Sequence, residues 1–188
     1  DPTKIVRIEG NYTHDLDDAE YSPFIDTEGL RERDWPRFWV VPKSTLTRQS
    51  GTLEVPKFAK NVKPGIELAF VLGRGGKYWT AEEGVDSIAG YLLLVDLGIY
   101  DPLPGQWGYR FFDGAMTFGS DLVSPDGVDL SSLRLSLELN GDELDSKSTS
   151  DWRFTPGEMV ETVSQIMTLE PGDIITTGNP MRVDETVE

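Results

Sequence analysis

The stretch Ile66-Glu-Leu-Ala-Phe-Val-Leu72 is short and almost wholly apolar, and Gly73-Arg-Gly-Gly76 follows it directly. A run of this length that ends in glycines predicts a buried β-strand followed by a loop. A second apolar run, Tyr91-Leu-Leu-Leu-Val95, predicts another buried strand. These two runs therefore predict two buried β-strands.

Between the two runs the sequence predicts a helix. Thr80-Ala-Glu-Glu83 has the pattern of a capping box, in which the threonine and the second glutamate satisfy the first backbone N–H groups. Val85, Ile88 and Ala89 continue with helical spacing, and Gly90 is expected to end the helix.

The C-terminal half predicts a hairpin, a helix and a strand. Leu133-Arg-Leu-Ser-Leu-Glu-Leu139 alternates strictly, and Asn140-Gly141 after it is a favoured two-residue hairpin turn. Residues 156–167 have the pattern of an amphipathic helix with Thr155 as its N-cap, and residues 169–175 return to a strand.

Three or more strands with two clear helices predict a mixed β fold with few helices, an α+β protein and not a doubly wound one. The length of 188 residues fits one domain, so we expect residues 1–188 to form a single unit. Residues 1–40 have an irregular pattern and are expected to be an N-terminal lid or extension, although residues 4–8 have the pattern of a strand.

Composition excludes several kinds of partner. The net charge of −16 and the pI near 4.4 disfavour nucleic acid and anionic membranes, which bind clustered Lys and Arg. The longest apolar run, residues 91–95, is too short to cross a bilayer. The absence of Cys and of a signal-peptide pattern favours a cytoplasmic protein. The dispersed acidic residues suit either a protein adapted to high salt or an ordinary acidic cytosolic protein.

Two carboxylates adjoin the apolar strands: Glu67 near the start of the first and Asp96 just after the second. A buried carboxylate needs a cation, a metal ion or hydrogen-bond donors beside it. Each residue on its own is explained more simply as a capping or salt-bridged acid at a strand end, because such acids are common.

Several short strings, in one order and spacing over residues 40–183, resemble the fumarylacetoacetate hydrolase family. They are Pro42-Lys-Ser44, Glu67-Leu-Ala-Phe-Val-Leu-Gly73, Ala89-Gly-Tyr91, Asp96, Asp101, Gln106-Trp107, Phe112-Asp113, Asn140-Gly141, Thr149-Ser-Asp-Trp-Arg-Phe154, Leu169-Glu-Pro-Gly-Asp-Ile-Ile-Thr-Thr-Gly178 and Pro180. The resemblance implies a mixed β-sandwich roll, commonly built into homodimers.

The resemblance also implies a metal site. In the family a Glu-x-Glu pair and an Asp after the next strand hold Mg²⁺ or Mn²⁺, and here Glu67 matches the second Glu and Asp96 the Asp. Gly65 stands where the first Glu is expected. Because water and a chelating substrate complete the shell of a hard cation, two carboxylates are expected to hold Mg²⁺, or Mn²⁺ or Ca²⁺, with reduced affinity.

Three further residues are expected at the substrate. Arg110 occupies the place of a family Lys that binds substrate oxygens, and it keeps the charge but cannot donate its proton. The alternative is an Arg paired with a nearby acid. Asn179 replaces a family Thr and keeps a hydrogen-bond donor, and Tyr100 replaces a family Arg just before Asp101.

His14, the single histidine, and Glu20 resemble the family pair that activates a water molecule. Their spacing departs from the family pattern, because His14 is one residue early and Glu20 is too distant. A histidine is suited to act as a base near neutral pH, and a lid could carry it inward. The alternative is a surface histidine in an acidic loop.

The resemblance implies a metal-dependent hydrolase or lyase that forms an enolate of a small 2-oxo or 1,3-dioxo acid such as an acylpyruvate. Because the spacing of His14 and Glu20 departs from the family pattern, decarboxylation, hydration or tautomerisation is favoured slightly over hydrolysis. The main alternative is a catalytically degenerate member that binds a small acid or acts as a structural module. A divalent ion would favour the enzyme, and an Arg bridge between Glu67 and Asp96 would favour the binding module. A third alternative is a generic acidic β domain whose strings match by chance.

Overall fold

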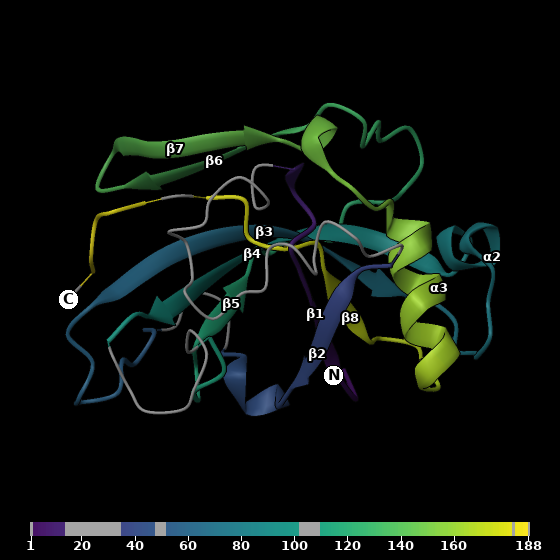
Figure 1. Cartoon of the computed structure of the whole chain (residues 1–188), viewed down its shortest axis with the longest axis horizontal. Helices are drawn as coiled ribbons and strands as arrows, with labels where there is room; N and C mark the ends of the chain where they lie inside the picture. Colours follow the sequence, from purple (N-terminus) through teal and green to yellow (C-terminus); the bar gives the residue numbers. More distant parts are fainter. Residues whose placement is uncertain (1, 14–34, 48–51, 102–109, 182, 188) are drawn as a thin grey trace.

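The computed structural model describes residues 2–13, 35–47, 52–101, 110–181 and 183–187, and a six-stranded sheet forms its centre (Figure 1). The strand order is β2-β1-β8-β3-β4-β5, with β1 and β8 parallel and the other neighbours antiparallel. The strands are β1 (Ile5–Glu9), β2 (Arg37–Val41), β3 (Val62–Leu72), β4 (Ile88–Ile99), β5 (Met116–Phe118) and β8 (Ile174–Thr176).

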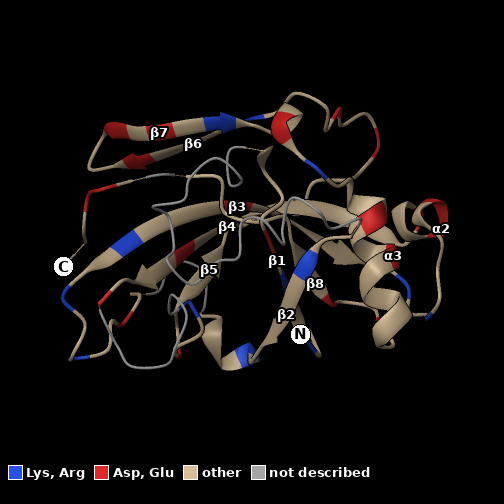
Figure 2. Ribbon diagram, viewed as in Figure 1, with Lys and Arg blue, Asp and Glu red and all other residues tan. Residues whose placement is uncertain are grey.

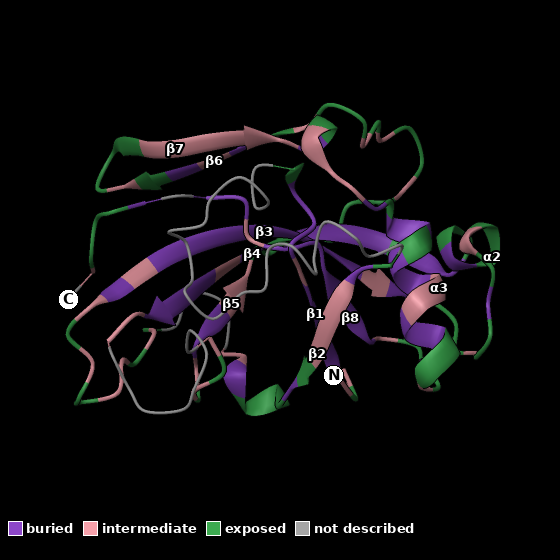
Figure 3. Cartoon of the chain, in the orientation of Figure 1, coloured by how far each residue is buried: buried purple, intermediate pink, exposed green. Residues whose placement is uncertain are grey.

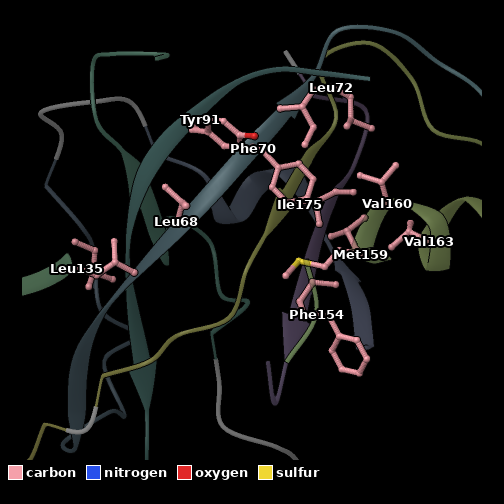
Figure 4. Close-up of a cluster of buried hydrophobic side chains, with 14 of the residues drawn as sticks. Leu68, Phe70, Leu72, Tyr91, Leu135, Phe154, Met159, Val160, Val163 and Ile175 are labelled. Carbon is pink, nitrogen blue, oxygen red and sulfur yellow. The ribbon is translucent and has the colours of Figure 1, made fainter. Parts of the chain in front are cut away.

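Side chains alternate between the two faces of this sheet, as strand geometry requires. One face buries Val6, Leu68, Phe70 and Ile175, and we call it the helix face because α3 (Pro156–Ile166) covers it. Figure 4 shows Phe70 and Ile175 of the sheet beside Met159 and Val160 of α3. The core on this side therefore forms between sheet and helix.

The opposite face has its own apolar cluster and carries the charged site described below. Ile5, Ala69, Leu94 and Ile174 are buried there with Met116 of β5. Figure 3 shows that β3 and β4 are mostly buried along their lengths. A charged side chain in the middle of this face is thus surrounded by apolar strands.

The predicted hairpin is confirmed as β6 (Arg134–Leu139) and β7 (Asp142–Ser148), which pair antiparallel as a separate two-stranded sheet. Asn140 and Gly141 have φ of 55° and 94°, the left-handed backbone that a two-residue turn of this kind requires. Leu135 and Leu137 turn inward and join the core on the helix face.

The predicted capping box at Thr80 before α2 (Ala81–Val85) and the predicted N-cap at Thr155 before α3 are confirmed, and Thr155 also forms a capping box with Glu158. The predicted end of the first helix is wrong. The helix stops at Val85, which is half exposed, and Ile88 begins β4 opposite Leu72. The apolar spacing that suggested one helix therefore belongs to two elements.

The predicted strand over residues 169–175 is shorter than expected, because β8 begins at Ile174. Pro171 cannot donate a backbone hydrogen bond, and Gly172 has φ of 90°, so residues 170–173 form a turn closed by the Asp173 N–H on the carbonyl of Glu170 at 3.1 Å.

The strand pattern over residues 4–8, within the segment of residues 1–40 that was expected to be irregular, is confirmed. Residues 5–9 form β1 inside the sheet, between β2 and β8, and β2 begins at Arg37. Val6 and Ile8 point to one face of the sheet and Ile5 and Arg7 to the other. This alternation is typical of a strand with two covered faces. Residues 14–34 lie outside the described residues, so the lid there, like the single domain, stays a prediction.

Candidate active site

Glu67 of β3 and Asp96 of β4 lie on the same face of the sheet. Gly65 is opposite Asp96 and Glu67 is opposite Leu94, and residues directly opposite each other in an antiparallel pair share a face. Both acids are 0 % exposed. Two carboxylates on one buried face repel each other and need cations or donors between them.

Arg7 of β1 supplies the cation that joins them. Its Nη2 donates to Oε1 of Glu67 and, at 2.7 Å, to Oδ2 of Asp96. Arg7 is 3 % exposed, and β8 and β3 separate its strand from β4. The side chain therefore crosses the sheet face to reach both acids.

Arg110 is the second cation at Asp96. Its Nη1 is 2.7 Å from Oδ2 of Asp96, and its Nη2 donates to the hydroxyl of Tyr100 at 2.7 Å. A Cβ atom at Gly65 would lie 2.9 Å from Nη1, and one at Gly98 would lie 3.0 Å from Cζ. Two glycines on one face thus let the guanidinium rest against the backbone of β3 and β4.

The residues after β8 complete the site. Gly178 has φ of 94°, and its N–H donates to Oε2 of Glu67 at 3.1 Å. The next residue, Asn179, accepts from the Met181 N–H with Oδ1, and its Nδ2 is 2.6 Å from where a Cβ of Gly65 would be. The amide of Asn179 therefore points to the same place as Arg110.

A buried asparagine, Asn11, holds the end of β8 in place. Asn11 donates from Nδ2 to the carbonyl of Thr177 at 3.1 Å and accepts the Phe154 N–H with Oδ1 at 2.9 Å. Its side chain is 0 % exposed. Asn11 thus holds together three segments that are distant in sequence, and the end of β8 is positioned by them.

The surroundings shift the pKa values of Glu67 and Asp96 in opposite directions. Burial raises the pKa of Glu67, and the neighbouring Arg7 opposes this only in part. Burial also acts to raise the pKa of Asp96, but Arg110 and Arg7 outweigh it and hold that pKa below its usual range. Asp96 is therefore the firmly ionised member of the pair.

The comparisons with known proteins decide the family. The family model described as the fumarylacetoacetate (FAA) hydrolase C-terminal domain matches residues 4–187. The chain belongs to the fumarylacetoacetate hydrolase family. An uncharacterised protein of Pyrococcus abyssi is 33 % identical over 187 residues, which cover 95 % of this chain and 79 % of that protein.

Two named relatives are enzymes. The mitochondrial oxaloacetate tautomerase FAHD2A of Bos taurus is 34 % identical over 132 residues, covering 67 % of this chain and 42 % of that protein. The structure of 5-carboxymethyl-2-hydroxymuconate delta-isomerase from Mycobacterium smegmatis superposes with a TM-score of 0.81 at 28 % identity, covering 99 % of this chain and 70 % of that one. The predictions of family, of fold class and of an enzyme of this family are therefore confirmed.

The metal ligands that the family resemblance implied do not fit a divalent ion in the observed arrangement. Both oxygens of Glu67 and Oδ2 of Asp96 are taken by hydrogen bonds or ion pairs, which leaves Oδ1 of Asp96. Among the described residues no group of three or more His, Cys, Asp and Glu side chains could hold a metal. The predicted Mg²⁺, Mn²⁺ or Ca²⁺ stays a prediction.

Most of the predicted site residues meet in one place. Asp96, Arg110, Tyr100 and Asn179 lie around Gly65 and Gly98, and Glu67 is joined to Asp96 through Arg7, although their roles stay predictions. His14 and Glu20 lie outside the described residues.

Sequence reasoning missed Arg7. The signal was a single charge between Val6 and Ile8 in an apolar strand, in a chain whose two buried carboxylates required cations. The alternative for Arg110, pairing with a nearby acid, matches its contact with Asp96.

Proposed function

We propose that this chain catalyses enolate chemistry on a small 2-oxo or 1,3-dioxo acid, as a tautomerase or isomerase. The observation that carries the proposal is the set of donors around Tyr100. Arg110 donates to its hydroxyl, and Nζ of Lys63 and Cζ of Arg110 lie 5.6 and 5.8 Å from the centre of its ring. Two cations beside a phenol suit an anionic, oxygen-rich ligand.

Each side chain has a distinct part in this proposal. The Arg110 side chain is 11 % exposed and that of Arg7 is 3 %, so Arg110 is the guanidinium that meets a carboxylate arriving from solvent. The Tyr100 hydroxyl accepts from Arg110 and donates its own proton to the enolate oxygen. Asn179 donates from Nδ2 to the same ligand. Preorganised donors of this kind stabilise charge that develops during reaction.

Keto–enol exchange moves one proton from carbon to oxygen, so it also needs a base near the carbon. His14 or Glu20 is proposed for this part, as the family resemblance implied. C–C hydrolysis of an acylpyruvate additionally needs a base that delivers water, and the altered spacing of His14 and Glu20 makes it the less favoured reaction.

The test is a screen of wild-type protein with oxaloacetate, acylpyruvates and other small 2-oxo acids, following the ultraviolet absorbance of enol and keto forms. Arg110→Met should lower kcat/KM by about 100-fold, as removal of one charge-stabilising donor does. Arg134→Met is the matched control, because Arg134 pairs with Glu143 on the hairpin and is 61 % exposed. An equal rate in Arg110→Met and wild type would contradict the proposed role.

The Arg7 bridge also favours a second candidate, a small-acid binding module without turnover. Calorimetry with oxalate, a small diacid that is not turned over, separates the two. Binding that depends on Arg110, with no turnover in the whole screen, would establish the module. Turnover that depends on Arg110 would establish the enzyme, and neither binding nor turnover would contradict both.

We also propose a homodimer in the cytoplasm, as expected from the resemblance and the composition. Among the described residues no helix is long and apolar enough to cross a bilayer. Sedimentation at several protein concentrations tests the dimer.

A further inference from the structure

We propose that Arg7 is the resident cation of this site, and that its guanidinium takes the place of a divalent metal ion between Glu67 and Asp96. The single nitrogen Nη2 bonds to one oxygen of each carboxylate, and all three side chains are buried. One fixed positive group thus holds both acids at a common point, as a shared ion would.

The charges of the site balance without an added ion. Glu67 and Asp96 contribute at most two negative charges, and Arg7 and Arg110 supply two positive ones beside them. A divalent ion would add two positive charges beside two guanidiniums in a site that is almost closed to water. Repulsion is weakly screened there, so such an ion would be bound poorly.

The oxygens of the site are also already engaged. Arg7 and the Gly178 N–H take the two oxygens of Glu67, and Oδ2 of Asp96 faces both guanidiniums. Oδ1 of Asp96, which lies 2.5 Å from where a Cβ of Gly65 would be, is the oxygen without a hydrogen-bond partner in the described part of the chain. Mg²⁺ is held at about 2.0–2.1 Å by one or two carboxylates together with water or substrate, and to reach Glu67 it would have to displace the hydrogen bonds from Arg7 and the Gly178 N–H.

Position 65 cannot provide a third ligand while the other side chains stay in place. A Cβ there would lie within 2.9 Å of Asp96, Asn179 and Arg110. A carboxylate would need still more room. Asp96, Asn179 and Arg110 therefore fill the space beside the glycine, and Arg7 supplies the positive charge between Glu67 and Asp96.

Arginine differs from a bound ion in two ways that can be measured. Its guanidinium keeps its positive charge at any ordinary pH. It is also part of the chain, so a chelator cannot remove it. The inference concerns the cation and not the substrate, so it is tested without any assay of turnover.

The experiment is a titration of chelator-treated protein with Mn²⁺, followed by electron paramagnetic resonance of the free ion, at fixed and high KCl to suppress binding to the acidic surface. Wild type and Asp96→Asn should give the same weak isotherm. The inference is overturned if wild type binds one Mn²⁺ about 10-fold more tightly than Asp96→Asn.

A second variant, Arg7→Met, tests the inference through a gain of Mn²⁺ binding. Arg7→Met removes the charge but keeps an unbranched side chain, and it should gain one Mn²⁺ site that Asp96→Asn in the same chain abolishes. A variant that folds only when Mn²⁺ is present gives the same support. A folded Arg7→Met that binds Mn²⁺ no better than wild type would overturn the inference. If Arg7→Met does not fold at all, the comparison of wild type with Asp96→Asn decides.

Discussion

Arg7 and Asp96 are 89 residues apart in sequence and are joined by a buried 2.7 Å hydrogen bond across the face of the sheet. Asp96 also faces Arg110 at 2.7 Å, so one carboxylate oxygen serves two guanidiniums. Ion pairs thus join β1 to β3 and β4, in addition to the backbone pairing that runs through β8. The hydrogen bond between Arg7 and Asp96 therefore contributes both to the stability of the fold and to the arrangement of the candidate active site.

Asp96→Asn should therefore destabilise the protein. The amide keeps the shape but leaves two buried guanidiniums with one carboxylate, and removing one partner of a buried ion pair costs about 3–5 kcal/mol of unfolding free energy. Urea denaturation measures this. Asp184→Asn is the control, because Asp184 pairs with Lys63 in an exposed position and should change stability little. Equal midpoints for both variants would show that Asp96 is not held in this way.

Gly65→Ala should disturb the site without removing any of its charges. The added methyl group would lie 2.5 Å from Asp96 and 2.6 Å from Asn179, so these side chains or Arg110 must move. We expect a loss of about 1–3 kcal/mol in unfolding free energy, typical of overpacking, together with weaker oxalate binding. Gly119→Ala is the control, since its Cβ would meet one atom, at 3.9 Å. Unchanged stability and binding in Gly65→Ala would contradict the observed position of Arg110.

We expect the contact that Asp173 makes between residues 3–4, just before β1, and the turn before β8 to be sensitive to acid. Burial acts to raise its pKa, but hydrogen bonds from Lys4, Thr3 and the Glu170 N–H hold that pKa below its usual value. The ionised group thus stabilises the folded state above its unfolded pKa of about 3.9, and this contribution is lost as the pH falls through the lower folded pKa. Asp173→Asn should destabilise the protein near neutral pH and flatten the fall in stability below about pH 4. Parallel pH profiles for the variant and wild type would refute this.

High salt should stabilise the protein, as the net charge of −16 predicts. Figure 2 shows acidic residues spread over the hairpin, α2 and the loops, and these repel one another in the folded state. Salt screens such repulsion over a Debye length of about 10 Å at 0.1 M. The melting temperature should rise from low to molar KCl, and a flat response would remove the prediction of adaptation to high salt.

Local patterns predicted much of this fold, because strands, turns and helix caps are specified by neighbouring residues. The alternation over residues 133–139, the Asn140-Gly141 turn and the caps at Thr80 and Thr155 are of this kind. The prediction that the helix reaches Gly90 was wrong, because the apolar spacing of Val85, Ile88 and Ala89 fits both a helix and the start of a strand. Tertiary pairing of Ile88 with Leu72 decides between them.

The candidate site was predictable only in part, for a related physical reason. Glu67 and Asp96 were recognisable because each carboxylate adjoins an apolar strand. Arg7 meets them across β8 and β3, and no local pattern encodes which strands become neighbours. The demand of buried carboxylates for a cation was evident, but the sequence left open whether a metal ion or an arginine would meet it.

The most direct test of the whole account is the effect of a chelator on turnover of whichever 2-oxo acid the screen identifies. With Arg7 as the fixed cation, kcat/KM should be the same before and after exhaustive treatment with EDTA, and added Mg²⁺ or Mn²⁺ should not raise it. Loss of turnover with EDTA, restored by Mg²⁺ or Mn²⁺ in wild type, would contradict the account.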